Sequence, residues 1–269
     1  MKQLLILLLV LALILCACGK APEETTPTTE TTAATTAETT VPETTAETTV
    51  PETSAPEITD PVHSELYIPG ISVEDVILYF NEVSLDAEFV NSGDPSVLQK
   101  WTEPIQYILY GSYTEEDYAV LTDFVPWLNT IEGFPGMSET QDLGTANLKL
   151  HFCGYSEFID LMGDSYTGCD GGVTFWYNED NEIYDATIGY VTEIDQEVRN
   201  SVILEEIYNG LGPVQDTALR PDSIIYSDFS QPQELTEIDE LILKLLYHPQ
   251  MECGMNAAEC EAVIRQLYY

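Results

Sequence analysis

Two adjacent glutamates, Glu205 and Glu206, lie in an apolar stretch of this chain, and Asn209 and Gln215 follow at short intervals. A glutamate in such surroundings can act as a general base toward water, and carboxylate and amide oxygens can bind a cation. Because residues i and i+4 lie on one face of a helix, Glu205 and Asn209 would point the same way. The spacing is therefore compatible with a metal-assisted hydrolytic site in which Glu206 would be the base.

The segment that carries these residues is predicted to be a mostly buried helix at about residues 196–211. Gly212 suits the left-handed conformation that often ends a helix, and Pro213 cannot continue one. Apolar residues recur along the segment at helical spacing: Val198, Val202, Ile207 and Leu211.

The surrounding sequence predicts an α+β fold, with a small twisted mixed sheet packed on helices and a helical C-terminal half. Helical patterns and capping residues occur at 73–88, 114–131, 157–162, 235–247 and 256–268. Alternating or continuous apolar runs predict strands at 105–110, 146–152, 173–178 and 183–191. The last two strands flank an acidic turn at 179–182 and should form a hairpin or adjacent edge strands.

Residues 1–17 have the composition of a bacterial secretory signal. Their apolar run, Leu4 to Leu15, is too short and too early to be a membrane-spanning helix of the mature protein. The residues up to Cys18 resemble a lipobox, which selects Cys18 for lipidation and leaves Cys16 in the discarded peptide. We expect palmitate-bearing lipid on Cys18 to hold this lipoprotein at the extracytoplasmic face of a bacterial cell membrane, with an uncleaved N-terminal anchor as the alternative.

Residues 18–60 are rich in Thr, Glu and Pro, and the segment TAETTVPET occurs at 36–44 and again at 45–53. They contain too few apolar residues to offset the entropy lost on ordering, so we expect a disordered tether. A tether of this kind suits a domain held away from the membrane at a Gram-positive cell surface. The remaining residues, 61–269, have the length of one folded domain.

The 61–269 domain is strongly acidic, with thirty-eight Asp and Glu residues against six Lys and Arg residues. Such a field makes nucleic acid and anionic lipid surfaces poor partners. Cations and cationic peptides remain as candidates, and solubility outside the cell is the simplest explanation of the charge.

Four cysteines, an even number in an exported chain, suggest two disulfides in the domain. Pairing of neighbours would join Cys153 to Cys169 and Cys253 to Cys260, because each bond closes a short loop. Sequence alone allows three connectivities, and a structural zinc site built from all four thiolates is the rival interpretation, although no C-x-x-C spacing is present.

The chain resembles the DUF2927 family of bacterial lipoproteins in segments that keep their order: KWTEPIQYILYGSYTEED (100–117), TIGYV (187–191), EEIYNGLGPVQD (205–216) and SIIYSDFSQPQELTEIDELILKLLYHP (223–249). The resemblance covers about residues 68–269. The same segments are distantly similar to metzincin-type zinc peptidases.

The peptidase pattern H-E-x-x-H-x-x-G-x-x-H retains its glutamate and its glycine here, as Glu206 and Gly212. Tyr226 matches a tyrosine that follows the active-site helix in those enzymes. The three histidine positions and a later methionine position carry other residues, namely Glu205, Asn209, Gln215 and Ile225. The resemblance implies a zincin-like fold in which an edge strand near 183–191 lines a substrate cleft.

Zinc peptidases hold their ion with three protein ligands, usually imidazoles. The oxygen donors Glu205, Asn209 and Gln215 suit calcium or magnesium better, so we expect no zinc and no cofactor, with calcium as the cation these donors would favour. The chain's histidines lie far from the motif in sequence, and His151, beside Cys153, is expected to be a surface or packing residue.

Three hypotheses about function follow. The first is a lipoprotein whose degenerate, peptidase-like cleft binds a peptide or protein of the cell envelope without cutting it, by strand addition. The second is an atypical metal-dependent peptidase with Glu206 as general base. The third is a structural envelope component with a vestigial cleft, in which Glu206 only fixes the turn after its helix. Fold analogy alone does not choose among them.

Overall fold

The computed structural model describes the backbone of residues 13–16 and, in full, residues 64–85, 96–228 and 231–269. The predicted lipidation site Cys18, the tether and the first residues of the predicted domain up to His63 lie outside the described residues. Within the described ranges, no helix is both long and apolar enough to cross a membrane.

The described strands form one mixed sheet. From one side to the other they are β1 (Leu13–Cys16), β6 (Gly171–Tyr177), β7 (Glu182–Val191), β5 (Leu148–Cys153), β3 (Ile105–Gly111) and β4 (Met137–Glu139), and β2 (Lys100–Trp101) also pairs with β7. Strands β4, β3, β5 and β7 run parallel, whereas β6 is antiparallel to β7 and β1 is antiparallel to β6.

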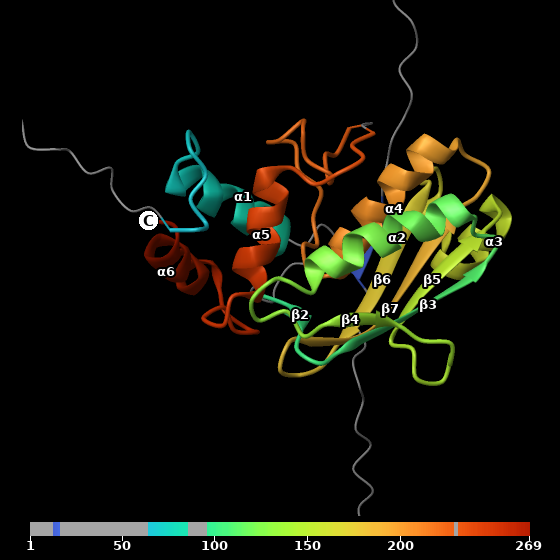
Figure 1. The fold of residues 1–269 in the computed structure, drawn as a ribbon, viewed down its shortest axis with the longest axis horizontal. Coiled ribbons are helices and arrows are strands. Elements are labelled where there is room, and N and C mark those ends of the chain that lie inside the picture. The colour runs from blue at the N-terminus through green and yellow to red at the C-terminus, as the bar shows by residue number, and fades with distance from the viewer. Residues whose placement is uncertain (1–12, 17–63, 86–95, 229–230) are drawn as a thin grey trace, which may run out of the picture. The chain divides into compact units, whose positions relative to one another are not determined.

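The two faces of the sheet differ because side chains alternate along each strand. On β5, Leu148, Leu150 and Phe152 are buried in the main core, whereas Lys149 and His151 point to the other face and are only partly buried. Two helices, α2 (Glu115–Leu128) and α4 (Gln196–Gly210), cover the core face side by side (Figure 1).

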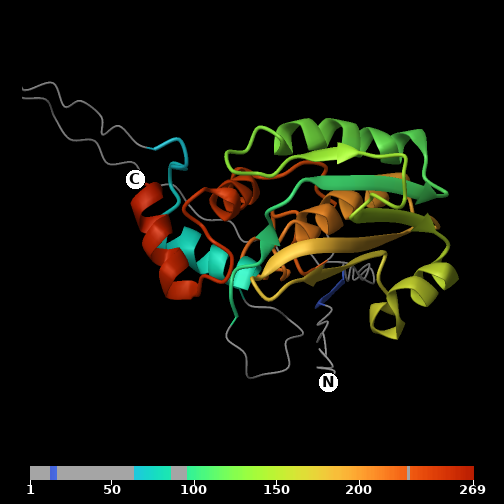
Figure 2. The ribbon, with the colours of Figure 1, turned by 90° about the horizontal axis from the view of Figure 1, so that it is seen from below.

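A short helix, α3 (Tyr155–Met162), covers part of the opposite face (Figure 2). Its approach depends on Gly189 of β7, where a Cβ atom would lie 2.8 Å from a ring carbon of Phe158 and 3.1 Å from Cγ of Met162. The missing side chain therefore lets α3 lie directly against the sheet.

Three further helices pack together beside the sheet: α1 (Val73–Leu85), α5 (Glu237–Tyr247) and α6 (Ala257–Leu267) (Figure 1). Helix α5 begins with a capping box in which the Thr236 hydroxyl and the Asp239 carboxylate accept backbone N–H groups from each other's residues. Its Tyr247 hydroxyl donates to the carbonyl of Leu211 at 2.7 Å, which ties α5 to the end of α4.

The predicted α+β arrangement is confirmed in its coarse form: the described residues contain a largely parallel mixed sheet and six α-helices. Each predicted helix and strand has a counterpart, although the described part of the first helix ends at Leu85 and the second ends at Leu128, two residues after Pro126. The hairpin is present, with Asn181 at a positive φ of 62° in its turn.

The predicted edge strand was assigned wrongly. Residues 183–191 belong to β7, which lies inside the sheet between β6 and β5. Its near-continuous burial, from Ile188 to Val191, reflects helices on both faces. The strand farther out is β6, and its outer side pairs with β1.

The predicted disulfide pairs are also not those of the structure. Cys153, Cys253 and Cys260 are free thiols, and Cys169 is disulfide-bonded to none of these three. Cys153 and Cys169 do share a small hydrophobic cluster, while Cys260 lies in the main core. Burial raises the pKa of the Cys153 and Cys260 thiols to about 11, with nearby Glu157 and Glu259 adding to the effect. Cys260 is therefore a packing residue of the main core, whereas Cys153 presents a free thiol in the smaller cluster.

Candidate functional site

Helix α4 carries Glu205, Glu206 and Asn209, Gln215 follows it in the next loop, and a buried ion pair fixes the first turns of the helix. Arg199 Nε donates to Asp117 Oδ1 at 2.7 Å, and the two side chains are 7 % and 0 % exposed. Asp117 also caps α2, where it belongs to a capping box with Thr114. The pair therefore locks the beginning of α4 to the beginning of α2, a link that the sequence patterns did not reveal.

Glu206 is fully buried and lies against the first residue of β6. A Cβ atom at Gly171 would lie 2.9 Å from Glu206 Cγ and 3.0 Å from its Oε1. Burial, with a further contribution from the Glu206 and Asp117 carboxylates, raises the pKa of the Tyr190 hydroxyl well above its usual range. The predicted base is thus held between α4 and the start of the β6–β7 hairpin.

The other three residues of the pattern, Asn209, Glu205 and Gln215, differ from one another in burial. Asn209 is fully buried, and neither polar atom of its side chain has a hydrogen-bond partner among the described residues. Glu205 and Gln215 are partly exposed, and the backbone N–H of Gln215 donates to the carbonyl of Val83 on α1 at 3.2 Å. Gln215 therefore belongs to a segment that packs on α1.

This donor set does not fit a zinc ion. It offers carboxylate and amide oxygens where a peptidase would present imidazoles. In the described part of the chain, Glu205, Glu206 and Asp216 also form no group of three His, Cys, Asp or Glu ligands close enough to share an ion. We therefore assign no step of a reaction to zinc at this position.

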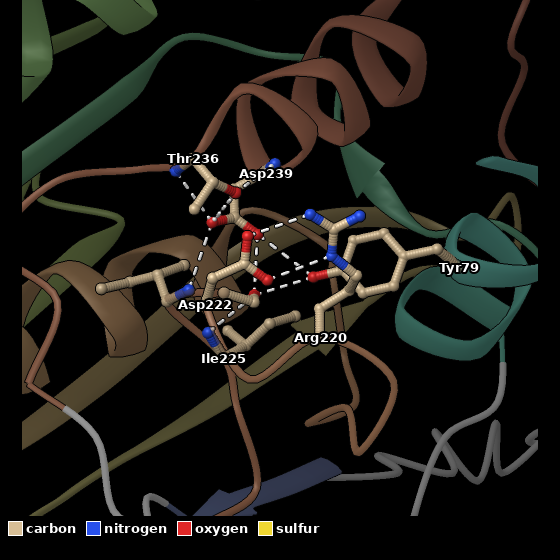
Figure 3. A network of polar contacts seen from close by, with 8 residues as sticks. Tyr79, Arg220, Asp222, Ile225, Thr236 and Asp239 are labelled. Atoms are coloured by element: carbon tan, nitrogen blue, oxygen red, sulfur yellow. Dashed lines mark hydrogen bonds and ion pairs between the residues drawn. The ribbon is translucent and has the colours of Figure 1, made fainter. Parts of the chain in front are cut away.

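The loop after α4 is held by a buried polar network centred on Asp239 (Figure 3). One carboxylate oxygen, Oδ1, accepts the hydroxyls of Tyr79 at 3.1 Å and Ser223 at 2.7 Å. The other, Oδ2, accepts the backbone N–H of Ile224 and both the N–H and the hydroxyl of Thr236. The network joins α1, the loop and α5 through one side chain.

The residues compared with the methionine and tyrosine of the peptidases lie in this loop. Ile225 is fully buried and its N–H donates to the Ser223 hydroxyl at 3.1 Å. Tyr226 is partly exposed and its hydroxyl donates to Asp228. Arg220 and Asp222 form an ion pair at 3.0 Å beside the network (Figure 3). All these contacts stabilise the loop, and none of them is made with Glu205 or Asn209.

A groove with a volume of about 460 Å³ lies between α2, α4 and the segment before α5. Its wall combines apolar and acidic side chains, including Phe124, Trp127, Leu235, Asp123 and Glu234. None of the four positions of the peptidase pattern lines it. The groove is thus separate from the position of Glu206 under β6.

Comparison with known protein families shows to which family the chain belongs. The family described as a protein of unknown function, DUF2927, matches residues 74–266. This chain belongs to the DUF2927 family. The match covers all six helices at least in part, and every described strand except β1, so the family corresponds to the folded domain. No curated protein matches this chain.

Proposed function

We propose that this DUF2927 protein is a lipid-anchored, extracytoplasmic peptide-binding protein that has a zinc-peptidase-like fold without the zinc. Its occupant would be an extended peptide, or a protein segment, that adds as a strand to the outer side of β6. The observation that carries the proposal is the pairing of β1 with β6.

Strand β1 pairs with β6 in antiparallel register, from Leu13 opposite Phe175 to Cys16 opposite Gly172. An unpaired strand edge presents a row of N–H and C=O groups that an extended chain can satisfy. Removal of the signal peptide before Cys18 would take β1 away from this edge. The mature protein would then have a free strand edge, with the register that β1 occupies, for a peptide from the cell envelope.

The surroundings of β6 favour recognition over cleavage. The last residue of β1, Cys16, pairs with Gly172, which is next to Gly171, and Gly171 lies against Glu206. A peptide that takes the place of β1 would therefore pass close to Glu206. The positions of the three peptidase histidines nevertheless carry Glu205, Asn209 and Gln215. Without ligands suited to zinc, the bound peptide would not face an activated water.

The proposal is tested with protein purified from the membranes of expressing cells. A library of extended peptides is screened for binding, and hydrogen–deuterium exchange is then measured with and without the best peptide. We expect slower exchange in residues 171–177. Strand β4 at the other side of the sheet serves as the internal control and should be unchanged. N-methylation of alternate peptide residues should abolish binding, because it removes donors to the strand.

Protection confined to the groove between α2 and α4 would refute strand addition at β6. Cleavage of the peptides that stops with a chelator and in Glu206→Gln would instead establish the atypical peptidase. Failure of every peptide and of every envelope protein to bind would leave the structural role as the better explanation.

A further inference from the structure

Three potential metal ligands meet on the face of the sheet opposite α4. His151 and Cys153 come from the end of β5, and Glu157 comes from the first turn of α3. One candidate ligand atom from each residue lies within 4.8 Å of the other two. We propose that these three side chains form a metal site, with zinc as the ion that suits them best.

The fold brings the three residues together for simple reasons. His151 and Cys153 are two residues apart on a strand, so their side chains share a face. Only Gly154 separates β5 from α3, which places Glu157 immediately beside the strand that it follows. Gly189, the β7 neighbour of His151, leaves the space that α3 occupies.

The spacing matches a tetrahedral ion. His151 Nε2 and Glu157 Oε1 are 3.3 Å apart. Nitrogen and oxygen ligands about 2.0–2.1 Å from a tetrahedral zinc are separated by roughly 3.3 Å. The two side chains therefore need little movement to share an ion. The stacking of the Tyr110 ring on the imidazole, with centroids 4.3 Å apart, holds the orientation of the histidine.

The ligand types also favour this ion. A thiolate, an imidazole and a carboxylate are all common zinc ligands, and the thiolate selects against calcium and magnesium. Three protein ligands leave a fourth position open to water. The Glu157 side chain is 64 % exposed, so an ion can reach the cluster from solvent.

An ordinary ion pair between His151 and Glu157 is the competing explanation. It accounts for the 3.3 Å contact, but it does not account for the free Cys153 thiol in the same cluster. A metal ion held by all three side chains accounts for both the contact and the thiol.

The test uses the full chain, purified in the presence of a reductant and a chelator and then freed of both. Titration with Co²⁺ reports a thiolate ligand through a near-ultraviolet charge-transfer band, and competition with a chromophoric indicator reports the affinity for Zn²⁺. We expect one equivalent of metal and a thiolate band. Cys153→Ser should abolish the band, and it should weaken zinc binding by at least about tenfold.

Cys253→Ser is the matched control, because it removes another free thiol that lies outside the cluster. It should retain both the band and the affinity. Glu157→Gln, on the exposed side of the site, should weaken zinc binding without disturbing the fold, which near-ultraviolet circular dichroism checks. The proposal is overturned if wild type shows no band, if Cys153→Ser binds like wild type, or if Glu157→Gln leaves the affinity unchanged.

Peptide binding at β6, measured in the same variants, distinguishes a failure of the metal site from a failure of the proposed function. The cluster lies on β5 and α3, so Cys153→Ser and Glu157→Gln should bind peptide like wild type. Loss of metal binding with peptide binding intact, or the reverse, tells which of the two proposals has failed.

Discussion

The carboxylates of Asp117, Glu206 and Asp239 belong to residues with no solvent-exposed surface. Burying a charge costs several kcal/mol unless partners within the protein replace water. Asp117 has the Arg199 guanidinium, whereas Asp239 has hydroxyl and amide donors. Asp117 and Asp239 therefore stabilise the fold, and Glu206 lies against the proposed peptide-binding strand.

Replacement of Asp239 by asparagine should reduce the free energy of unfolding by about 3 kcal/mol. The NH₂ group of the asparagine would face hydroxyl and N–H groups that are themselves donors, so hydrogen bonds would be lost. Hydrogen bonds to charged groups contribute about 1.5–3 kcal/mol each. Urea unfolding followed by circular dichroism measures the change. Glu240→Gln, in the same helix but part of a half-exposed ion pair with Lys244, should cost less than about 0.5 kcal/mol.

The stability contributed by Asp117 should depend on pH in a defined direction. Burial by itself would raise the pKa of this carboxyl, but hydrogen bonds from Arg199, Gln196 and Thr114 outweigh burial and lower the pKa below its ordinary value of 3.8. Its contribution is therefore complete above the unfolded-state pKa and is lost as the pH falls through the folded-state pKa.

Asp117→Asn should accordingly cost about 3 kcal/mol at neutral pH, because it breaks a buried ion pair. The difference from wild type should shrink as the pH falls below 3.8. Urea midpoints of the two proteins, measured from neutral pH to about pH 3, decide this. A difference that stays constant over the range would mean that ionised Asp117 does not stabilise the fold. Glu261→Gln, in an exposed pair with Arg265, is the control and should change little.

At the scale of elements, the contact between β6 and α4 positions the proposed binding edge. It depends on Gly171, since a Cβ atom there would come within 2.4 Å of Val202 Cγ1. Glycine at this position lets the start of the strand lie directly on the helix that carries Glu206. The geometry of the edge and the position of the glutamate are therefore coupled.

Gly171→Ala should separate β6 from α4 and destabilise the protein by about 1–3 kcal/mol, the usual cost of overpacking a core. It should also weaken peptide binding at β6. Urea unfolding and the peptide assay measure the two effects. Gly144→Ala, at an exposed glycine, should leave both unchanged. Wild-type affinity in Gly171→Ala would show that the α4 contact does not shape the binding edge.

At the scale of the whole molecule, we propose separate tasks for the acidic domain and the N-terminal segment. A chain with a net charge of −39 is repelled by anionic lipid surfaces, so the proposed attachment to a membrane would have to come from another part. The proposed anchor on Cys18 meets this need without any contact between the domain and the bilayer.

Cys18→Ala should abolish incorporation of labelled palmitate and block removal of the signal peptide, whereas Cys16→Ala should retain both. Metabolic labelling and the mobility of the protein on denaturing gels provide the measurements. Equal labelling of the two variants would refute Cys18 as the lipidated residue.

The sequence by itself determined the local elements, because these depend on short-range patterns. The capping boxes at Thr114 and Thr236 and the apolar spacing of α4 were sufficient to predict three helices. The donor chemistry of Glu205, Asn209 and Gln215 likewise follows from residue type alone. The placement of α4 as a mostly buried helix was predicted correctly.

Only the tertiary structure decided which strand lies outermost, because strand order depends on pairings between distant segments. In the structure β7 lies inside the sheet, so the candidate binding edge is β6 and not β7. Cys153, Cys253 and Cys260 are free thiols. The tertiary structure also brought His151, Cys153 and Glu157 together on the face of the sheet opposite α4, away from the helix that carries the peptidase-like pattern. Periodicity specifies the face of a strand or helix, but the neighbour on that face is fixed only when the whole chain packs.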